Sequence, residues 1–446
     1  MKKKVYDLLF LYDALDADHM NELARTIKTS VILKSARRFV RLLFSYETIF
    51  VLFLNAGRLK SFPLFSRLPV DLTILTFIIC FLGYTWNLLI GKEKIRVTPG
   101  SGLLTMLTFL FAILAFISLL WTSSNFYSSQ KILQVAILIP FCLFNGLYII
   151  GPNQDRINRF SFLITLICFL YIFDAFTVFR LQSRTRSIVT ENLQYLQIGS
   201  SVSIAMMVVF NQYINSHSRL GSVFLASVLG FFGIVLLVLG GRGPLITAIL
   251  PIVLSIDIVL RKSALRKERR KRNQKLGILF LLVIVILAGT LVNTDSFATL
   301  NRMAIILSGD MGNSANVRIE LFLAAFRIWM SKPLLGAGIG GFPVDGGYGD
   351  IRLYPHNLFL EVMAEFGTLG LLLLIAILCI LVWKRGHEIR KPATLLFILL
   401  FMNTFIRAQL SGDLSDNRML FFTIGLCVAG SRKDILHIGD SKMMRR

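Results

Sequence analysis

The sequence predicts an all-α protein that crosses a membrane many times. Of its 446 residues, 55% are hydrophobic, and the mean hydropathy is +0.69. Apolar runs of about 20 residues recur along the chain, and each is long enough to span a hydrocarbon core of about 30 Å. Because lipid offers the backbone no hydrogen-bond partners, such runs form helices, and the alternation of a β-barrel is absent.

Charged residues, prolines and glycines separate the apolar runs and set the predicted helix boundaries. About 12 transmembrane helices are expected, at 42–57, 70–91, 102–121, 131–150, 160–179, 197–214, 221–240, 243–260, 277–293, 368–384, 394–410 and 418–430. The segment before the first helix contains several acidic residues and does not resemble a short basic signal peptide, so no cleaved signal is expected.

The distribution of basic residues predicts the orientation. The net charge is +23, but the basic residues concentrate in alternate connections, as the positive-inside rule requires. The 261–275 connection is the strongest case, with nine basic residues and one acidic residue. Both termini are therefore expected in the cytoplasm, and nucleic acid is not an expected partner.

The chain is expected to have five parts. They are a basic cytoplasmic segment at 1–41, helices 1–9 at 42–293, an outer loop at 294–367, helices 10–12 at 368–430, and a cytoplasmic tail at 431–446. The first part suits contact with anionic membrane lipids.

The outer loop contains a predicted amphipathic helix at 313–333. Its apolar residues at helical spacing are Val317, Leu321, Ala324, Ala325 and Ile328. The helix is expected to lie on or beside the outer membrane surface, and a flexible glycine-rich stretch at 336–341 follows it.

Cations on the outer face break the orientation rule and need another explanation. They are Arg58, Lys60 and Arg67 in the first outer loop, and Arg180, Arg184 and Arg186 in the third. A cation at the edge of a helical bundle is costly unless it faces water, a partner or an anion. Arg184 and Arg186 are therefore candidates for anion binding, although solvation of the loop explains them equally simply.

Arg242 and Arg318 are further candidates for binding an anion. Arg242 lies in the tight turn GGRGP (240–244) at the start of a predicted helix, where a guanidinium and free backbone N–H groups together favour phosphate. The alternative is an arginine that extends to lipid headgroups. Arg318 begins the amphipathic helix and either pairs with an acid such as Glu320 or reaches into a cleft.

His356 is a candidate general base. Neutral histidine can accept a proton from a hydroxyl near neutral pH, although a single histidine is more often structural. Asn357 marks the start of a helix, and Gly367 permits close helix contact. Glu361 and Glu365 follow at four-residue spacing, and whether Glu365 orients His356 is open.

Other catalytic signatures are absent from the sequence. It contains no P-loop, dinucleotide-binding glycine motif or Ser-His-Asp order. The five cysteines lack metal-ligand spacing and are expected to be small buried side chains: Cys80, Cys142, Cys168, Cys379 and Cys427. No metal and no cofactor is expected.

These motifs resemble the bacterial O-antigen ligase and O-antigen polymerase superfamily, enzymes that move undecaprenyl-diphosphate-linked glycans. The resemblance rests on NVRIELFLAAFRIW (316–329), SKPLLGAGIGGF (331–342), the GGRGP turn, and His356-Asn357 followed after nine residues by GTLG. It covers about 240–384 well, and the rest only through the number of spans and the placement of loops.

The resemblance implies a GT-C-like glycosyltransferase of the bacterial inner (cytoplasmic) membrane with its active site on the outer face. His356 matches the general base toward the acceptor hydroxyl. Arg242 and Arg318 match the cations that bind the donor diphosphate, and Arg184 and Arg186 are further candidates because of their charge. The supporting residues are Asn357, Glu365 and Gly367. Transfer is expected to be metal-independent and to invert the anomeric centre.

Four alternatives stay open for the function, and one of them is a membrane scaffold for an assembly complex. A polymerase, which we place first, adds the glycan to another lipid-linked repeat unit, whereas a ligase adds it to lipid A-core or another acceptor. The short 180–196 loop favours a ligase. A transporter of small anions or glycolipids is the alternative of another class, but the two halves of the chain lack matching polar interruptions. A chain-length regulator is a further candidate partner.

Overall fold

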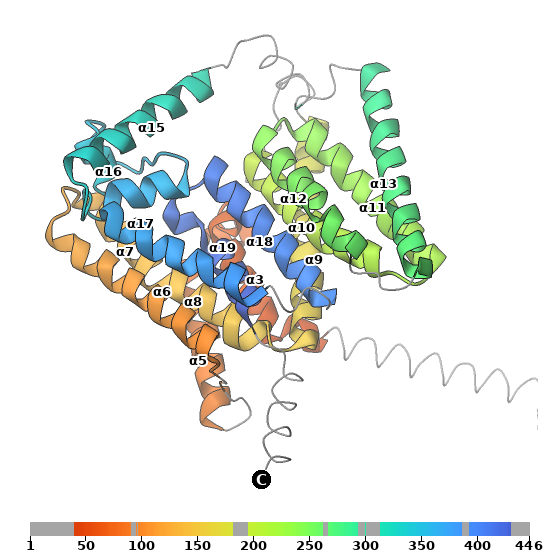
Figure 1. Cartoon of the computed structure of the whole chain (residues 1–446), viewed down its shortest axis with the longest axis horizontal. Coiled ribbons are helices and arrows are strands. Elements are labelled where there is room, and N and C mark those ends of the chain that lie inside the picture. Colours follow the sequence, from red (N-terminus) through yellow and green to blue (C-terminus); the bar gives the residue numbers. More distant parts are fainter. Residues whose placement is uncertain are drawn as a thin grey trace, which may run out of the picture.

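Helices build the whole of the described structure. The computed structural model describes residues 40–90, 95, 97–181, 195–261, 266–292, 299, 313–385 and 392–429, and no β-strand occurs among them. Figure 1 shows α3, α18 and α19 in the middle of the bundle. The group α5, α6, α7, α8 and α17 lies on one side of them, and α10 to α13 lie on the other.

All twelve predicted segments are helical. The helices are α3 (Tyr46–Leu59), α5 (Leu72–Leu89), α6 (Pro99–Ile117), α7 (Phe126–Leu133), α8 (Ile139–Phe144), α9 (Gln154–Leu181), α10 (Tyr195–Asn215), α11 (Arg219–Leu239), α12 (Arg242–Arg261), α13 (Arg266–Val292), α17 (Leu358–Arg385), α18 (Pro392–Leu410) and α19 (Arg418–Val428). The smaller or extramembrane elements are α4 (Pro63–Ser66), α15 (Asn313–Ser331), α16 (Phe342–Asp345), and the 3-10 turns η1 (Ser118–Leu120) and η5 (Leu414–Asp416).

Seven helices of the described chain are long and apolar enough to cross a membrane. They are α5, α6 with η1, the continuous run from Phe126 to Ile150, α9, α11, α12 and α17. Two further apolar helices, α18 and α19, are shorter. The expected class, an all-helical polytopic membrane protein, is confirmed, and the number of twelve spans stays a prediction.

The run from Phe126 to Ile150 changes its helical type along its length. Two π-helical segments, η2 (Gln134–Leu138) and η3 (Asn145–Ile150), flank α8. Pro140 lies at the start of α8 and lacks a backbone N–H, so the regular hydrogen-bond ladder is interrupted there. The helix nevertheless continues, which places Lys131 and Gly146 on one element.

One predicted boundary is wrong by about ten residues. The helix predicted at 277–293 begins at Arg266, so much of the basic connection is helical. The prediction relied on apolar periodicity, and the charged residues of this extension have none, so the extension was not predicted. Lys275 supplies a tertiary reason for it, because its Nζ donates to the carbonyl oxygens of Tyr213 and Ser216 at 2.6 and 2.7 Å, at the end of α10.

The connections gather at two ends of the bundle, as their predicted alternation requires. At one end Arg352 pairs with Asp416 at 2.7 Å, which joins two connections predicted to lie outside. At the other end Arg159 pairs with Glu47 at 2.9 Å, joining two segments predicted to lie inside. This contact also explains how Glu47 is buried in the first predicted helix. The orientation relative to the bilayer stays a prediction.

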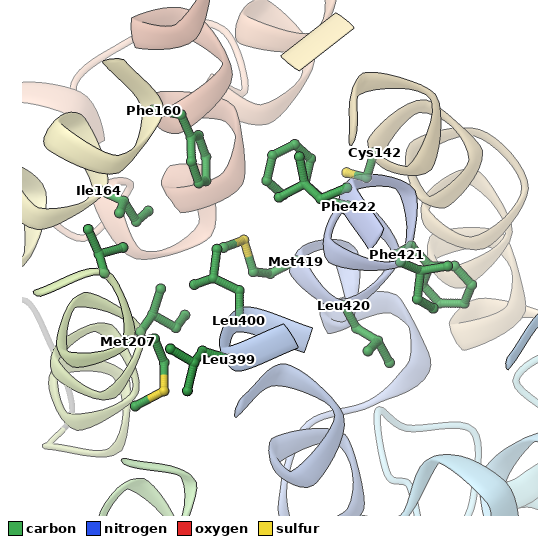
Figure 2. Packing of buried hydrophobic residues seen from close by; sticks show 14 of the residues in the cluster. Cys142, Phe160, Ile164, Met207, Leu399, Leu400, Met419, Leu420, Phe421 and Phe422 are labelled. Atoms are coloured by element: carbon green, nitrogen blue, oxygen red, sulfur yellow. The ribbon is translucent and has the colours of Figure 1, made fainter. Parts of the chain in front are cut away.

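The core is centred on α18 and α19. Figure 2 shows Phe421 and Phe422 of α19 among side chains from α8, α9 and α18. A Cβ atom on Gly146 would lie 2.1 Å from the carbonyl oxygen of Phe422, and one on Gly425 would lie 2.3 Å from that of Leu143. The two backbones therefore approach as closely as small residues allow.

The element α17 begins at Leu358, ahead of the predicted start at 368, because two helices join in it across a kink. The helix is kinked at Gly367, whose φ of 61° and ψ of −159° are not helical. A Cβ atom at Gly367 would lie 2.4 Å from the carbonyl carbon of Leu334, so only glycine fits here. The predicted helix corresponds to the part of α17 that follows this kink.

Backbone hydrogen bonds around the kink join α17 to the glycine-rich stretch. The N–H groups of Ala337 and Gly338 donate to the carbonyl oxygens of Ala364 and Glu365, both at 2.8 Å. The N–H group of Thr368 donates to the carbonyl oxygen of Pro333, also at 2.8 Å. These bonds satisfy groups that the kink removes from the helical ladder.

The prediction that 336–341 is flexible is wrong. All six residues are buried, and three of the glycines adopt positive φ: Gly336, Gly338 and Gly340. A Cβ atom on Gly338 would lie 2.6 Å from Thr122, and one on Gly340 would lie 2.8 Å from Ser128. The glycines let the 336–341 backbone pack closely against α17 on one side and against Thr122 and α7 on the other, because no side chain fits there.

The amphipathic helix is confirmed as α15. Its inner face packs toward α16 and α17 through Leu321, Ala324, Ala325 and Ile328. Val317, which was predicted on the same face, is 50% exposed, because it lies ahead of the part of α15 that packs. Cys379 likewise contradicts its expectation, since it is exposed on α17, whereas the other four cysteines are buried.

Candidate functional site

His356 occupies a strained position at the start of α17. Its φ is 55°, and no other non-glycine residue in the described chain has positive φ. Its ring packs edge-on against the ring of Tyr354 with centroids 4.5 Å apart. Its Nδ1 atom is buried and has no hydrogen-bond partner. Strain and an unsatisfied buried nitrogen in one residue are typical of a functional position.

Asn357 holds the start of the helix that follows. Its side-chain oxygen accepts from the N–H of Leu360 at 3.1 Å, and its carbonyl oxygen accepts from the N–H of Glu361 at 3.0 Å. This is an N-cap, as the sequence indicated. Asn357 therefore fixes the backbone beside His356.

Arg318 lies within electrostatic range of both Arg242 and His356. Arg242 is the first residue of α12, and Arg318 lies in the second turn of α15. Burial and then the positive charge of Arg242 lower the pKa of Arg318. Burial and then the positive charge of Arg318 lower the pKa of His356 below its ordinary 6.5. We call Arg242, Arg318 and His356 the His-Arg cluster.

The electrostatics of the His-Arg cluster define its chemistry. Because its pKa is lowered, the His356 imidazole is neutral at physiological pH and can accept a proton. The two guanidinium groups concentrate positive charge that an anion such as a diphosphate would neutralise. A base beside an anion site suits transfer of a group from a phosphorylated donor to a hydroxyl.

Asp350 anchors the loop that carries His356. Its carboxylate accepts from the N–H groups of Asn125 and Phe126 at 2.8 and 2.7 Å and from the Ser124 hydroxyl at 2.6 Å. Although partial desolvation opposes the shift, these bonds lower the pKa of Asp350 to about 2. The loop is therefore fixed to the start of α7 at any physiological pH.

A buried ionic network, which the sequence did not reveal, holds α17 against α7. Lys131 Nζ contacts carboxylate oxygens of Glu361 at 2.5 Å and of Glu365 at 2.7 Å, and all three side chains are fully buried. Glu361 also accepts from the N–H of Leu414 at 2.9 Å. Two acids four residues apart on an apolar helix were the available signal, because buried carboxylates require a cation.

This network answers the question about Glu365. The carboxylate pairs with Lys131 and accepts from the N–H of Gly340, and no hydrogen bond joins it to His356. Glu365 therefore positions α17 and the glycine-rich stretch. Gly367, the third supporting candidate, provides the kink described above.

The remaining candidates lie elsewhere. Arg184 and Arg186 fall outside the described residues. Within the described part of the chain, no group of three or more His, Cys, Asp or Glu residues is placed to hold a metal ion. The carboxylates of the outer connections have protein partners, namely Asp345, Asp350, Asp413 and Asp416.

The structure is that of a polytopic helical membrane protein in which a histidine and two arginines from distant segments form one electrostatically coupled cluster. Residues 225–375 match the model of the family described as O-antigen ligase, and this match supports membership of the chain in the O-antigen ligase and polymerase superfamily. The matched region contains Arg242, Arg318 and His356. No curated protein and no solved structure matches the chain.

Proposed function

We propose that the protein is a surface-polysaccharide polymerase. In this proposal it transfers an undecaprenyl-diphosphate-linked glycan to a sugar hydroxyl of another lipid-linked repeat unit. The observation that carries the proposal is the His-Arg cluster, in which Arg318 lies within electrostatic range of both His356 and Arg242, and the three residues come from segments distant in sequence. The proposal includes a GT-C-like arrangement of twelve spans in the inner membrane, with cytoplasmic termini and the cluster on the outer face.

The proposed mechanism is a single displacement. His356 accepts the proton of the acceptor hydroxyl while its oxygen attacks the anomeric carbon from the face opposite the diphosphate. The bond from that carbon to the diphosphate oxygen breaks, and undecaprenyl diphosphate leaves with the bonding pair. Arg242 and Arg318 stabilise the charge that develops on this leaving group, so no metal is required in the proposal. The proton then passes from His356 to water.

A ligase is the second candidate, and the description of the matched family favours it. The same base and cations serve either acceptor, so the cluster does not separate the two. Glycan profiles separate them. A failed polymerase leaves single repeat units available for attachment, whereas a failed ligase leaves long chains on the undecaprenyl carrier.

The proposal is tested by glycan profiling in a host that lacks the native gene. We expect the wild type to restore the mature glycan and Arg242→Ala to abolish it at matched membrane abundance. Arg327→Ala is the matched control, because Arg327 is an exposed arginine on the same helix as Arg318. Normal glycan with Arg242→Ala would exclude the assigned role of Arg242. If purified protein moves the glycolipid without forming a new glycosidic bond, the transporter alternative holds.

The activity is expected to fall in acid below the ordinary pKa of histidine. A general base must be unprotonated, and the pKa of His356 is lowered by burial and by Arg318, so kcat/KM is retained until the pH falls below the ordinary histidine pKa of 6.5. Arg318→Gln removes a positive charge and should move this acid limb to higher pH. The measurement is the initial transfer rate against pH for the wild type, Arg318→Gln and the control Arg327→Gln. An acid limb that Arg318→Gln leaves in place would contradict the assignment of His356.

A further inference from the structure

Three other arginines lie at the end of the bundle that carries the His-Arg cluster. Arg58 lies in the last turn of α3, Arg407 in the last turn of α18, and Arg418 is the first residue of α19. Arg58 lies within electrostatic range of both Arg407 and Arg418. We call these three residues the second arginine cluster. None was a candidate for a functional site in the sequence, although Arg58 violated the orientation rule.

The positive charge of this cluster is not balanced by the described residues. Asp416 acts on Arg58 and Arg407, but its carboxylate already pairs with Arg352 at 2.7 Å. No ion pair joins any of the three cluster arginines to a carboxylate of the described chain. The one carboxylate that acts on Arg58 and Arg407 is therefore engaged elsewhere.

The side-chain contacts of the second arginine cluster are with neutral groups. Arg58 donates to the Ser201 hydroxyl at 2.6 Å. Arg418 lies over the Phe53 ring at 5.5 Å, and its Nη1 atom is buried without a hydrogen-bond partner. Arg407 donates no side-chain hydrogen bond within the described chain. Since an uncompensated cation removed from water is costly, this arrangement points to an anion that is bound during function.

Tyr354 connects the second arginine cluster to the candidate base. It lies within electrostatic range of both Arg318 and Arg407, and its ring contacts that of His356. An anion on the second cluster would therefore lie near the base, while the donor diphosphate is assigned to Arg242 and Arg318. The group left to occupy the second cluster is one carried by the acceptor.

We propose that the second arginine cluster binds a phosphate or carboxylate group of the acceptor, which makes the acceptor an anionic glycan or glycolipid. The inference rests on the proposed function for the identity of this ligand. Two sources share the chemistry: the diphosphate of a lipid carrier and an acidic sugar of the glycan. Guanidinium groups bind either oxyanion through paired hydrogen bonds.

Binding to the full chain in nanodiscs of zwitterionic lipid tests the proposal without turnover. Inorganic pyrophosphate and glucuronate are the probes, and the rise in unfolding temperature is the readout. In the Arg242→Gln/Arg318→Gln variant we expect stabilisation by at least one probe to remain, and we expect it to disappear when Arg407→Gln and Arg418→Gln are added. Stabilisation by pyrophosphate alone would indicate that the ligand is a carrier diphosphate. Stabilisation by glucuronate alone would indicate an acidic sugar. Stabilisation by neither probe in the first variant would overturn the proposal.

A second measurement separates ligand binding from a structural role. Without ligand, Arg407→Gln should raise the unfolding temperature, because it removes an uncompensated charge. The matched control Arg352→Gln should lower it, because Arg352 is paired with Asp413 and Asp416. Arg407→Gln should also raise the KM for the acceptor about ten- to a hundredfold and leave the KM for the donor unchanged. A lower unfolding temperature for ligand-free Arg407→Gln would mean that the arginine is structural.

A failure of this inference can be distinguished from a failure of the proposed function. Probe binding requires no reaction, so it can be observed in a His356→Asn background. If the probes bind there while His356→Asn supports normal glycan synthesis, the proposed mechanism fails and the anion subsite stands. If the probes do not bind and His356→Asn is inactive, the transferase stands without this subsite.

Discussion

Replacing His356 with asparagine is expected to lower the rate of glycan transfer by about 10²- to 10⁴-fold, the usual contribution of a general base. Asparagine tolerates the left-handed backbone that His356 adopts at φ 55° better than most residues, so the loop is expected to keep its conformation. The amide cannot accept the acceptor's proton. The loss should therefore appear in kcat, with little change in the unfolding temperature.

The measurement is single-turnover transfer by purified protein, together with its unfolding temperature. His356→Ala is a less informative variant, because alanine is unfavourable at this φ and changes the backbone as well as the chemistry. Asn357→Ala is the matched control, since it removes the N-cap of α17 at a cost of about 1 kcal/mol but keeps the base. If His356→Asn retains more than about a tenth of the wild-type rate, well above the loss expected for a general base, then His356 is structural.

Replacing Lys131 with methionine is expected to destabilise the protein by about 3–5 kcal/mol, the range found when one partner of a buried ion pair is removed. Methionine fills a similar volume but leaves the carboxylates of Glu361 and Glu365 buried without their cation. These residues join α7 to α17, so α17 and the loop before it should lose their fixed position. Activity should fall together with stability.

The comparison with Glu365→Gln makes this prediction specific. That variant removes one of two carboxylates around a single lysine and preserves the pair between Lys131 and Glu361, so its effect on stability should be much smaller. Unfolding midpoints in one lipid or detergent give the comparison. A second test adds Glu361→Gln and Glu365→Gln to Lys131→Met, which should recover part of the loss because no buried charge is then unpaired. Equal stability of Lys131→Met and the wild type would refute the structural role of this network.

The residues of the His-Arg cluster could be chosen from the sequence because each has a local signal. Arg242 follows two glycines at the start of a helix, Arg318 begins an amphipathic helix, and His356 precedes a helix cap. These signals belong to one segment each, so they identify candidates without showing that the candidates meet. The placement of α12, α15 and the loop before α17 within electrostatic range of one another decides that question.

The sequence by itself determined the helical membrane class and the resemblance to O-antigen ligases and polymerases, because apolar length and motif spacing are properties of contiguous residues. Tertiary structure alone decided that Glu365 pairs with Lys131, that the glycine-rich stretch packs against a kink at Gly367, and that Arg58 meets Arg407 and Arg418. The physical reason is that a buried charge or a freed backbone group is satisfied by whatever segment lies within a few ångströms of it, and no periodicity within either segment encodes that distance.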